Sequence, residues 1–214
     1  LYWEEGDRRF APYTDDTQMA EVVLRSVVEA REVGEDLDTA MKRLARGFIR
    51  WDSEPQGGHR APGGACRAGC RALAHGFPWD EAGVEKAGGC GSVMRAYPLG
   101  LIFAGDEAEA ERWAVAQSKL THRDPIALAA CAAMAVGMRR LYHGSTVPDA
   151  VAAMIETAAR YSPGTAEMMQ RAEQEASEGI GPEVTLDRLR AWAAHEAIAA
   201  AVYIVSRHGD DPRA

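Results

Sequence analysis

Apolar residues recur at helical spacing along nearly the whole chain, and this pattern restricts the fold more than any other feature of the sequence. Residues 17–33 show it clearly, with a stripe formed by Met19, Val22, Val23, Val27 and Ala30. No stretch alternates apolar and polar residues with the Val, Ile, Thr and aromatic content that is typical of strands. The sequence therefore predicts an all-α protein.

Helix boundaries follow from capping residues and from two glycine-rich breaks at residues 52–64 and 88–92. Asp124 is the expected N-cap of an alanine-rich helix that begins at Pro125 and is suited to the middle of a bundle. The predicted helices cover approximately residues 17–33, 37–51, 65–75, 93–103, 106–120, 125–142, 147–160, 164–177 and 186–207.

Composition excludes several classes of protein. The 214 residues, 47% of them hydrophobic, suffice for one domain with a sizeable core. The net charge of -8 argues against a constitutive nucleic-acid partner, because neutralising phosphates requires an excess of Lys and Arg. No secretory signal or apolar run of roughly 18 residues is visible, so we expect a cytoplasmic protein with no membrane partner. We expect reduced thiols and no zinc site at the four cysteines, Cys66, Cys70, Cys90 and Cys131.

The most distinctive local feature is Tyr13-Thr14-Asp15-Asp16-Thr17, at the start of the first predicted helix. Two adjacent carboxylates flanked by hydroxyls place four hard oxygen donors within one turn, a set that suits Mg²⁺, Mn²⁺ or Ca²⁺. The other interpretation is a helix cap, because Asp and Thr are ordinary residues at helix N-termini. The spacing leaves both interpretations open.

Two further segments could hold a ligand. Glycines at 88, 89 and 91 let the backbone approach closely, and free N–H groups at a helix start near Val93 would suit a phosphate. A plain connecting loop has the same composition. In the segment 121–125, His122 either reaches a ligand or is solvated. We interpret four other histidines as structural or surface residues, because none has a partner at catalytic spacing: His75, His143, His195 and His208.

Three segments in order resemble the ADP-ribosylglycohydrolase family: Tyr-Thr-Asp-Asp-Thr-Gln-Met-Ala at 13–20, Gly-Cys-Gly-Ser-Val-Met-Arg-Ala at 89–96 and Thr-His-Arg-Asp-Pro-Ile-Ala at 121–127. The resemblance extends over essentially the whole chain. It implies an all-α orthogonal multi-helix bundle with a site for two metal ions, Mg²⁺ or Mn²⁺, that removes ADP-ribose from an acceptor. The ligand would be ADP-ribose or an ADP-ribosylated protein.

By this resemblance, the metal ligands are Thr14, Asp15 and Asp16, and the two aspartates are the catalytic carboxylates. The residues that would line the ADP-ribose groove are Gly89, Cys90, Gly91, Ser92 and Met94. His122 would lie against a phosphate or ribose of the ligand, and Arg95 is either a phosphate contact or part of a structural ion pair. Metal ions can orient the ribose hydroxyls and activate a water while a carboxylate handles the proton, through an oxocarbenium-like state.

The chain departs from the family pattern in two places. The family normally opens with a helix carrying Gly-Asp-Ala-Leu-Gly and ends with a second metal motif, Gly-Asp-x-Asp-Ser/Thr, and neither motif is present here. Near the end, Asp210 and Asp211 are adjacent rather than alternating, and we interpret them as a cap. We therefore expect residues 1–214 to form a single domain that lacks these two segments, with no identifiable catalytic base.

Three hypotheses about function remain open. The first is a metal-dependent glycosidase that releases ADP-ribose from a protein side chain or a small conjugate. The second is a catalytically inactive ADP-ribose-binding or crystallin-like structural member of the same fold, suggested by the missing second metal motif. The third is a metal-dependent phosphoester hydrolase. Sequence does not identify the acceptor, which is an arginine, a serine, a nucleic-acid end or a small molecule.

Overall fold

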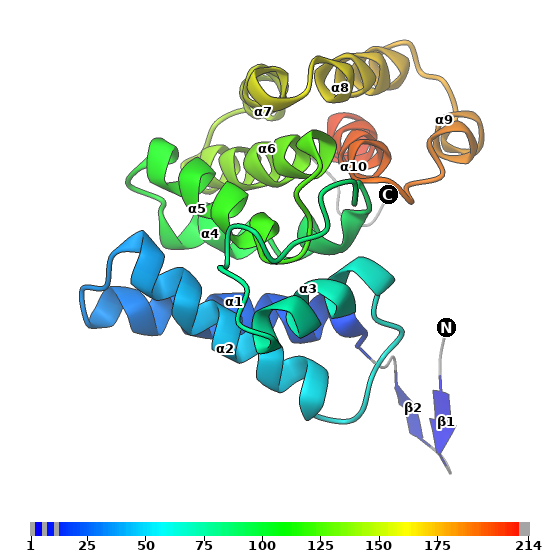
Figure 1. Ribbon diagram of the computed structural model, residues 1–214. Coiled ribbons are helices and arrows are strands. Elements are labelled where there is room, and N and C mark those ends of the chain that lie inside the picture. The colour runs from blue at the N-terminus through cyan, green and yellow to red at the C-terminus, as the bar shows by residue number, and fades with distance from the viewer. Residues whose placement is uncertain (1–2, 6–7, 11–12, 210–214) are drawn as a thin grey trace.

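The computed structural model describes residues 3–5, 8–10 and 13–209. Within these ranges the chain forms ten α-helices, one 3-10 turn and a two-stranded hairpin (Figure 1). The elements are β1 (Trp3–Glu5), β2 (Arg8–Phe10), α1 (Asp15–Glu32), α2 (Leu37–Ser53), α3 (Gly64–Ala74), η1 (Cys90–Ser92), α4 (Tyr97–Ile102), α5 (Glu107–Lys119), α6 (Pro125–Tyr142), α7 (Val147–Tyr161), α8 (Pro163–Ser177), α9 (Pro182–Leu189) and α10 (Ala194–His208).

The structure confirms the all-α prediction, apart from the short hairpin. Its strands pair antiparallel, with Trp3 opposite Phe10, and each strand has three residues. Three residues are too few to produce the sustained alternation that would reveal a strand in the sequence. Helix α6 spans the predicted residues 125–142, and its N-cap Asp124 accepts a hydrogen bond from the amide of Ile126, as expected of a capping side chain.

The helices form two groups around one core. Figure 1 shows α1, α2 and α3 together, coloured blue to cyan, and the helices from α4 to α8 with α10 on one side of them. Helix α6 contacts α4, α5, α7, α8 and α10, and its buried alanines allow this close packing. None of the helices within the described ranges is long and apolar enough to cross a membrane.

Two predicted helices are wrong in their extent. The segment 93–103 begins its helix only at Tyr97, because Pro98 has no amide proton to donate to a carbonyl in the preceding turn. The segment 186–207 is two helices, α9 and α10, rather than one. Arg190 and Ala191 have φ values of 57° and 54°, in the left-handed region, and a right-handed helix cannot continue through them.

Candidate functional site

The first predicted motif lies at the N-terminus of α1. Thr14 is the N-cap residue, but its hydroxyl makes no capping hydrogen bond and instead donates to Oδ2 of Asp16 at 2.5 Å. Asp15 and Asp16 occupy the first turn of the helix rather than the cap. The side chains of the motif are therefore not consumed in capping, and Thr14 and Asp16 present neighbouring oxygen atoms.

Asp15 and Asp16 form an uncompensated pair of carboxylates. Asp15 is 7% exposed, whereas Asp16 is exposed, and neither forms an ion pair with a basic side chain of the described residues. Burial, and then the charge of Asp16, raises the pKa of the Asp15 carboxyl, while nearby backbone amides such as that of Gly63 partly offset the rise.

A cation would relieve this repulsion, and hard oxygen donors fit Mg²⁺ or Mn²⁺. The residues of this motif therefore suit the implied metal ions in charge and donor type. Among the described residues, no group of three or more His, Cys, Asp or Glu side chains is arranged to hold a metal ion. This part of the chain thus offers two carboxylates and one hydroxyl.

Arg60 holds the backbone around this motif and was missed by the sequence analysis. Its carbonyl accepts a hydrogen bond from the amide of Asp15 at 3.2 Å, and its Nη1 donates to the carbonyl of Tyr13 at 3.3 Å. Its guanidinium also lies over the Tyr13 ring, 4.5 Å from the ring centroid. A lone arginine in a Gly/Pro-rich loop carries no sequence signal for this role.

The second and third motifs lie against each other. A side chain at Gly91 would meet Sγ of Cys66 at 2.6 Å and Cε1 of His122 at 3.0 Å, so only glycine fits between them. The amide of Gly91 makes no backbone hydrogen bond within the described chain. This amide belongs to the 3-10 turn η1 and not, as predicted, to a helix start at Val93.

His122 is buried, with 2% of its surface exposed, so the solvated interpretation is wrong. Its Nδ1 lies 2.8 Å from Oγ1 of Thr121. Burial, and then the charge of Arg95, lowers the pKa of His122 to about 3. The imidazole is therefore neutral at physiological pH, and its Nε2 is the ring nitrogen near Gly89 and Gly91.

The glycine segment also lies near the carboxylates of α1. The pKa of the Cys90 thiol is raised by burial and then by the charges of Asp16 and Asp15. Two other predicted lining residues face the interior. Ser92 is fully buried and accepts a hydrogen bond from Ser118 Oγ at 2.8 Å, and Met94 is partly buried against the core.

Arg95 forms no ion pair with a carboxylate within the described residues. It is fully buried, donates to Gln117 Oε1 and Thr121 Oγ1 at 2.7 Å each, and lies over the Phe48 ring. Burial lowers the pKa of this guanidinium. Thr121 Oγ1 also contacts His122, so Arg95 helps to fix the position of the histidine through Thr121.

Trp192 lies beside the glycine segment, and the sequence analysis did not single it out. Its indole is 85% exposed, in the loop between α9 and α10. The next residue, Ala193, pairs with Gly89 in an isolated bridge, and the amide of Ala194 donates to the carbonyl of Gly88 at 2.8 Å. The sequence would have indicated Trp192 only if a helix break had been predicted there. The prediction of one continuous helix over residues 186–207 placed Trp192 inside that helix.

The remaining predictions concern thiols, histidines and the last aspartates. All four cysteines are free, as expected. His75 and His143 bond to the carbonyls of Arg71, at 2.7 Å, and Ala104, at 2.5 Å, which suits structural or surface roles. Nδ1 of His195 is buried without a partner in the described part of the chain. Asp210 and Asp211 lie outside the described residues.

Comparison with known proteins places these motifs in context. A family model described as ADP-ribosylglycohydrolase matches residues 2–214. An ADP-ribosyl-[dinitrogen reductase] glycohydrolase from Rhodospirillum rubrum is 33% identical over 119 residues, which is 55% of this chain and 37% of that protein. An uncharacterized protein from Archaeoglobus fulgidus is 30% identical over 133 residues, 62% of this chain and 41% of that protein. The chain thus matches about two-fifths of the length of these relatives.

Proposed function

Because the chain belongs to the ADP-ribosylglycohydrolase family, we propose that its protein hydrolyses the glycosidic bond between ADP-ribose and a modified protein side chain or a small conjugate. The reaction class follows from the family. The residues of the site support the proposed substrate and metal dependence.

The observation that supports the proposal best is the position of the glycine segment between the carboxylates and His122. On one side, Asp15 and Asp16 are close enough to raise the pKa of the Cys90 thiol. On the other side, His122 and Cys66 together leave room only for a hydrogen atom at Gly91. A ligand on this segment would therefore contact anionic oxygens at one end and a neutral imidazole at the other.

Each end suits a different part of ADP-ribose. The amide of Gly91 has no backbone partner in the described chain, and it can donate to the diphosphate. Nε2 of the neutral His122 can form a hydrogen bond with a phosphate or ribose oxygen, and this bond involves no charge on the imidazole. The exposed indole of Trp192 offers a flat surface on which an adenine ring can stack.

The carboxylate end suits the reacting ribose. Thr14, Asp15 and Asp16 would hold Mg²⁺ or Mn²⁺, which supplies Lewis-acid stabilisation at the ribose hydroxyls and a water of lowered pKa. Asp16 is the exposed carboxylate of the pair and can accept a proton from a water molecule in the site. Buried Asp15 contributes a fixed negative charge, which favours the oxocarbenium-like transition state.

The test is release of ADP-ribose from an ADP-ribosylated protein by the whole protein with Mg²⁺ or Mn²⁺. Asp15→Asn and Asp16→Asn should each lower kcat/KM by at least about a hundredfold, since both change the charge at the reacting centre. Asp149→Asn is the matched control. Asp149 also lies in the first turn of its helix and also accepts a hydrogen bond from the N-cap threonine, Thr146, but it is remote from this site.

Unchanged activity in both Asp15 and Asp16 variants would contradict the assignment. Calorimetric uptake of ADP-ribose without hydrolysis under either metal would identify the inactive binder instead. Release of inorganic phosphate would identify the phosphoester hydrolase.

A further inference from the structure

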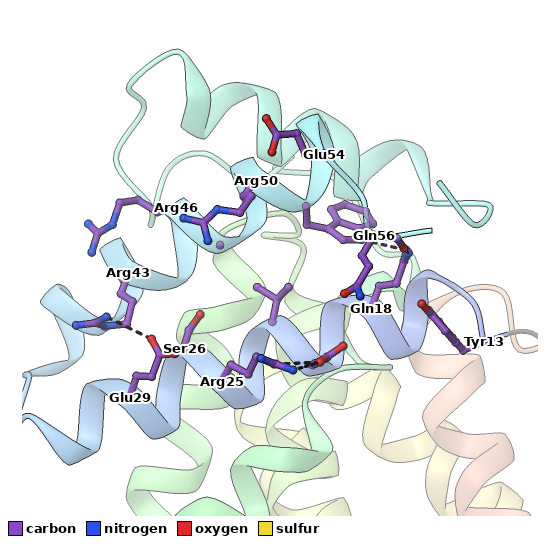
Figure 2. Close-up of a pocket in the computed structure, with 14 residues that line it drawn as sticks. Tyr13, Gln18, Arg25, Ser26, Glu29, Arg43, Arg46, Arg50, Glu54 and Gln56 are labelled. Carbon is purple, nitrogen blue, oxygen red and sulfur yellow. Dashed lines mark hydrogen bonds and ion pairs between the residues drawn. The ribbon is translucent and has the colours of Figure 1, made fainter. Parts of the chain in front are cut away.

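A second candidate binding site lies between α1 and α2, and Tyr13 and Gln18 of the first motif line one end of it. A groove of about 450 Å³ runs between these helices, and none of Thr14, Asp15 and Asp16 lines it. Figure 2 shows arginines of α2 along one wall and residues of α1, including Arg25 and Glu29, along the other.

Four arginines line the groove, and two of them have partners. Arg25 binds Glu21 at 2.6 Å, and Arg43 binds both Glu35 and Glu29. These acidic partners neutralise most of the charge of their arginines. The groove is therefore not uniformly basic, and its free charge belongs to other side chains.

The arginines of the groove without an ion pair among the described residues are Arg46 and Arg50. Both side chains are exposed, and neither makes an ion pair or hydrogen bond to another residue within the described part of the chain. They are four residues apart on α2, so their side chains leave the same face of the helix one turn apart. Among the carboxylates that line the groove, Glu54 has no ion pair within the described residues. It lies at the C-terminal end of α2.

A hydroxyl of α1 lies close to α2 at Gly47, in the same groove. Gly47 lies next to Arg46, and a side chain there would meet Cγ1 of Val22 at 2.8 Å and Oγ of Ser26 at 3.3 Å. The two helices can approach this closely because the position is glycine. Ser26 lines the same groove as the two arginines and is a further hydrogen-bond donor there.

We propose that Arg46, Arg50 and Ser26 form a binding site for a phosphate group. A phosphate dianion carries twice the charge of a carboxylate, and its terminal oxygens can accept hydrogen bonds from two guanidinium groups and a hydroxyl. Two arginines one turn apart on a rigid helix therefore favour phosphate over carboxylate through its greater charge. Free phosphate and the phosphate of a nucleotide both fit, since they present the same terminal group.

The experiment is a titration of the ¹⁵N-labelled chain with inorganic phosphate, AMP and acetate, followed by NMR. Amide signals of Gly47 and Ser26, and the indole N–H of Trp51, which donates to Gln18 Oε1 in the groove, report on binding. Signals of Gly89 and Gly91 report separately on the proposed ADP-ribose site, so the two proposals can fail independently. Phosphate should shift the groove signals saturably with a Kd of about 1 mM or below.

Variants of the two arginines provide the decisive comparison. Arg46→Ala and Arg50→Ala should each weaken phosphate binding about tenfold, and Lys at either position should restore only part of it, because an ammonium lacks the fork. Glu54→Gln should tighten binding, because it removes a repelling charge. Arg71→Ala is the control, since it removes the same charge from an exposed site on α3. Circular dichroism checks that each variant is folded.

Tighter binding of AMP than of inorganic phosphate would support the site and identify a nucleotide as its source. Tighter binding of inorganic phosphate would support it with free phosphate as the source. The absence of saturable groove shifts, equal loss in Arg71→Ala, or acetate binding as tight as phosphate would overturn the proposal.

Discussion

At the scale of single residues, the burial of His122 has a measurable consequence for stability. Its folded-state pKa is lowered to about 3, whereas an unfolded histidine titrates near 6.5. The unfolded chain therefore binds a proton that the folded chain excludes between these values. The stability that depends on neutral His122 is fully present above pH 6.5 and is lost as the pH falls toward 3.

We expect the free energy of unfolding to fall by about 2 kcal/mol between pH 7 and pH 5 through this residue alone. His122→Gln should remove this part of the pH dependence, because glutamine does not titrate. Urea unfolding of both proteins at the two pH values measures it, with His75→Gln as an exposed control. Equal pH dependence in wild type and His122→Gln would contradict the neutral, buried histidine.

For Trp192 we predict a change in ligand affinity with little change in the free energy of unfolding. Its indole is 85% exposed, so Trp192→Ala should change the free energy of unfolding by less than about 0.5 kcal/mol. The same change should weaken ADP-ribose binding about tenfold, because it removes the proposed stacking surface, and Trp192→Phe should restore most of it. Calorimetry measures the affinity. Unaltered binding by Trp192→Ala would place the adenine elsewhere.

At the scale of elements, the break between α9 and α10 determines where that tryptophan lies. Ala191 has a φ of 54°, a conformation that costs a residue with a Cβ roughly 1–2 kcal/mol relative to the right-handed region. The strained turn ends α9 and brings Ala193 beside Gly89. The strained turn therefore lies where the C-terminal helices contact the glycine segment, next to the proposed ligand site.

Glycine at this turn should relieve the strain. We expect Ala191→Gly to raise the free energy of unfolding by about 0.5–1 kcal/mol, the reverse of the usual cost of glycine. Ala197→Gly, within the regular helix α10, should lower it by a similar amount. Thermal unfolding of both variants measures the difference, and destabilisation by both would show that Ala191 is not strained.

At the scale of the whole molecule, the proposed metal ions should couple to folding. Ionised Asp15 is disfavoured by burial and by Asp16, so Asp15→Asn should raise the stability of the metal-free protein at neutral pH. Mn²⁺ at a hundred times its Kd should stabilise the wild type by about 2.7 kcal/mol and Asp15→Asn much less. Asp149→Asn should respond like the wild type. Calorimetric melting with and without Mn²⁺ measures both effects, and equal responses of wild type and Asp15→Asn would exclude a site at this carboxylate.

The sequence by itself determined the helical architecture and the order of the three motifs. Both are local properties, since a helix face repeats every few residues and a motif is contiguous. The limits of α6, with Asp124 as its cap, could be predicted for this reason. The hairpin was too short to show such a pattern, and the late start of α4 depended on one proline.

Only the tertiary structure decided which side chains face a ligand and which face the core. Arg95 and Ser92 belong to a motif that predicts ligand contact, yet both are buried beneath it. Arg60 and Trp192 belong to none of the three motifs. Arg60 nevertheless forms hydrogen bonds with Tyr13 and Asp15, and Trp192 lies beside Gly89. These positions depend on contacts between segments far apart in the chain, because burial is set by what packs against a residue and not by its neighbours in sequence.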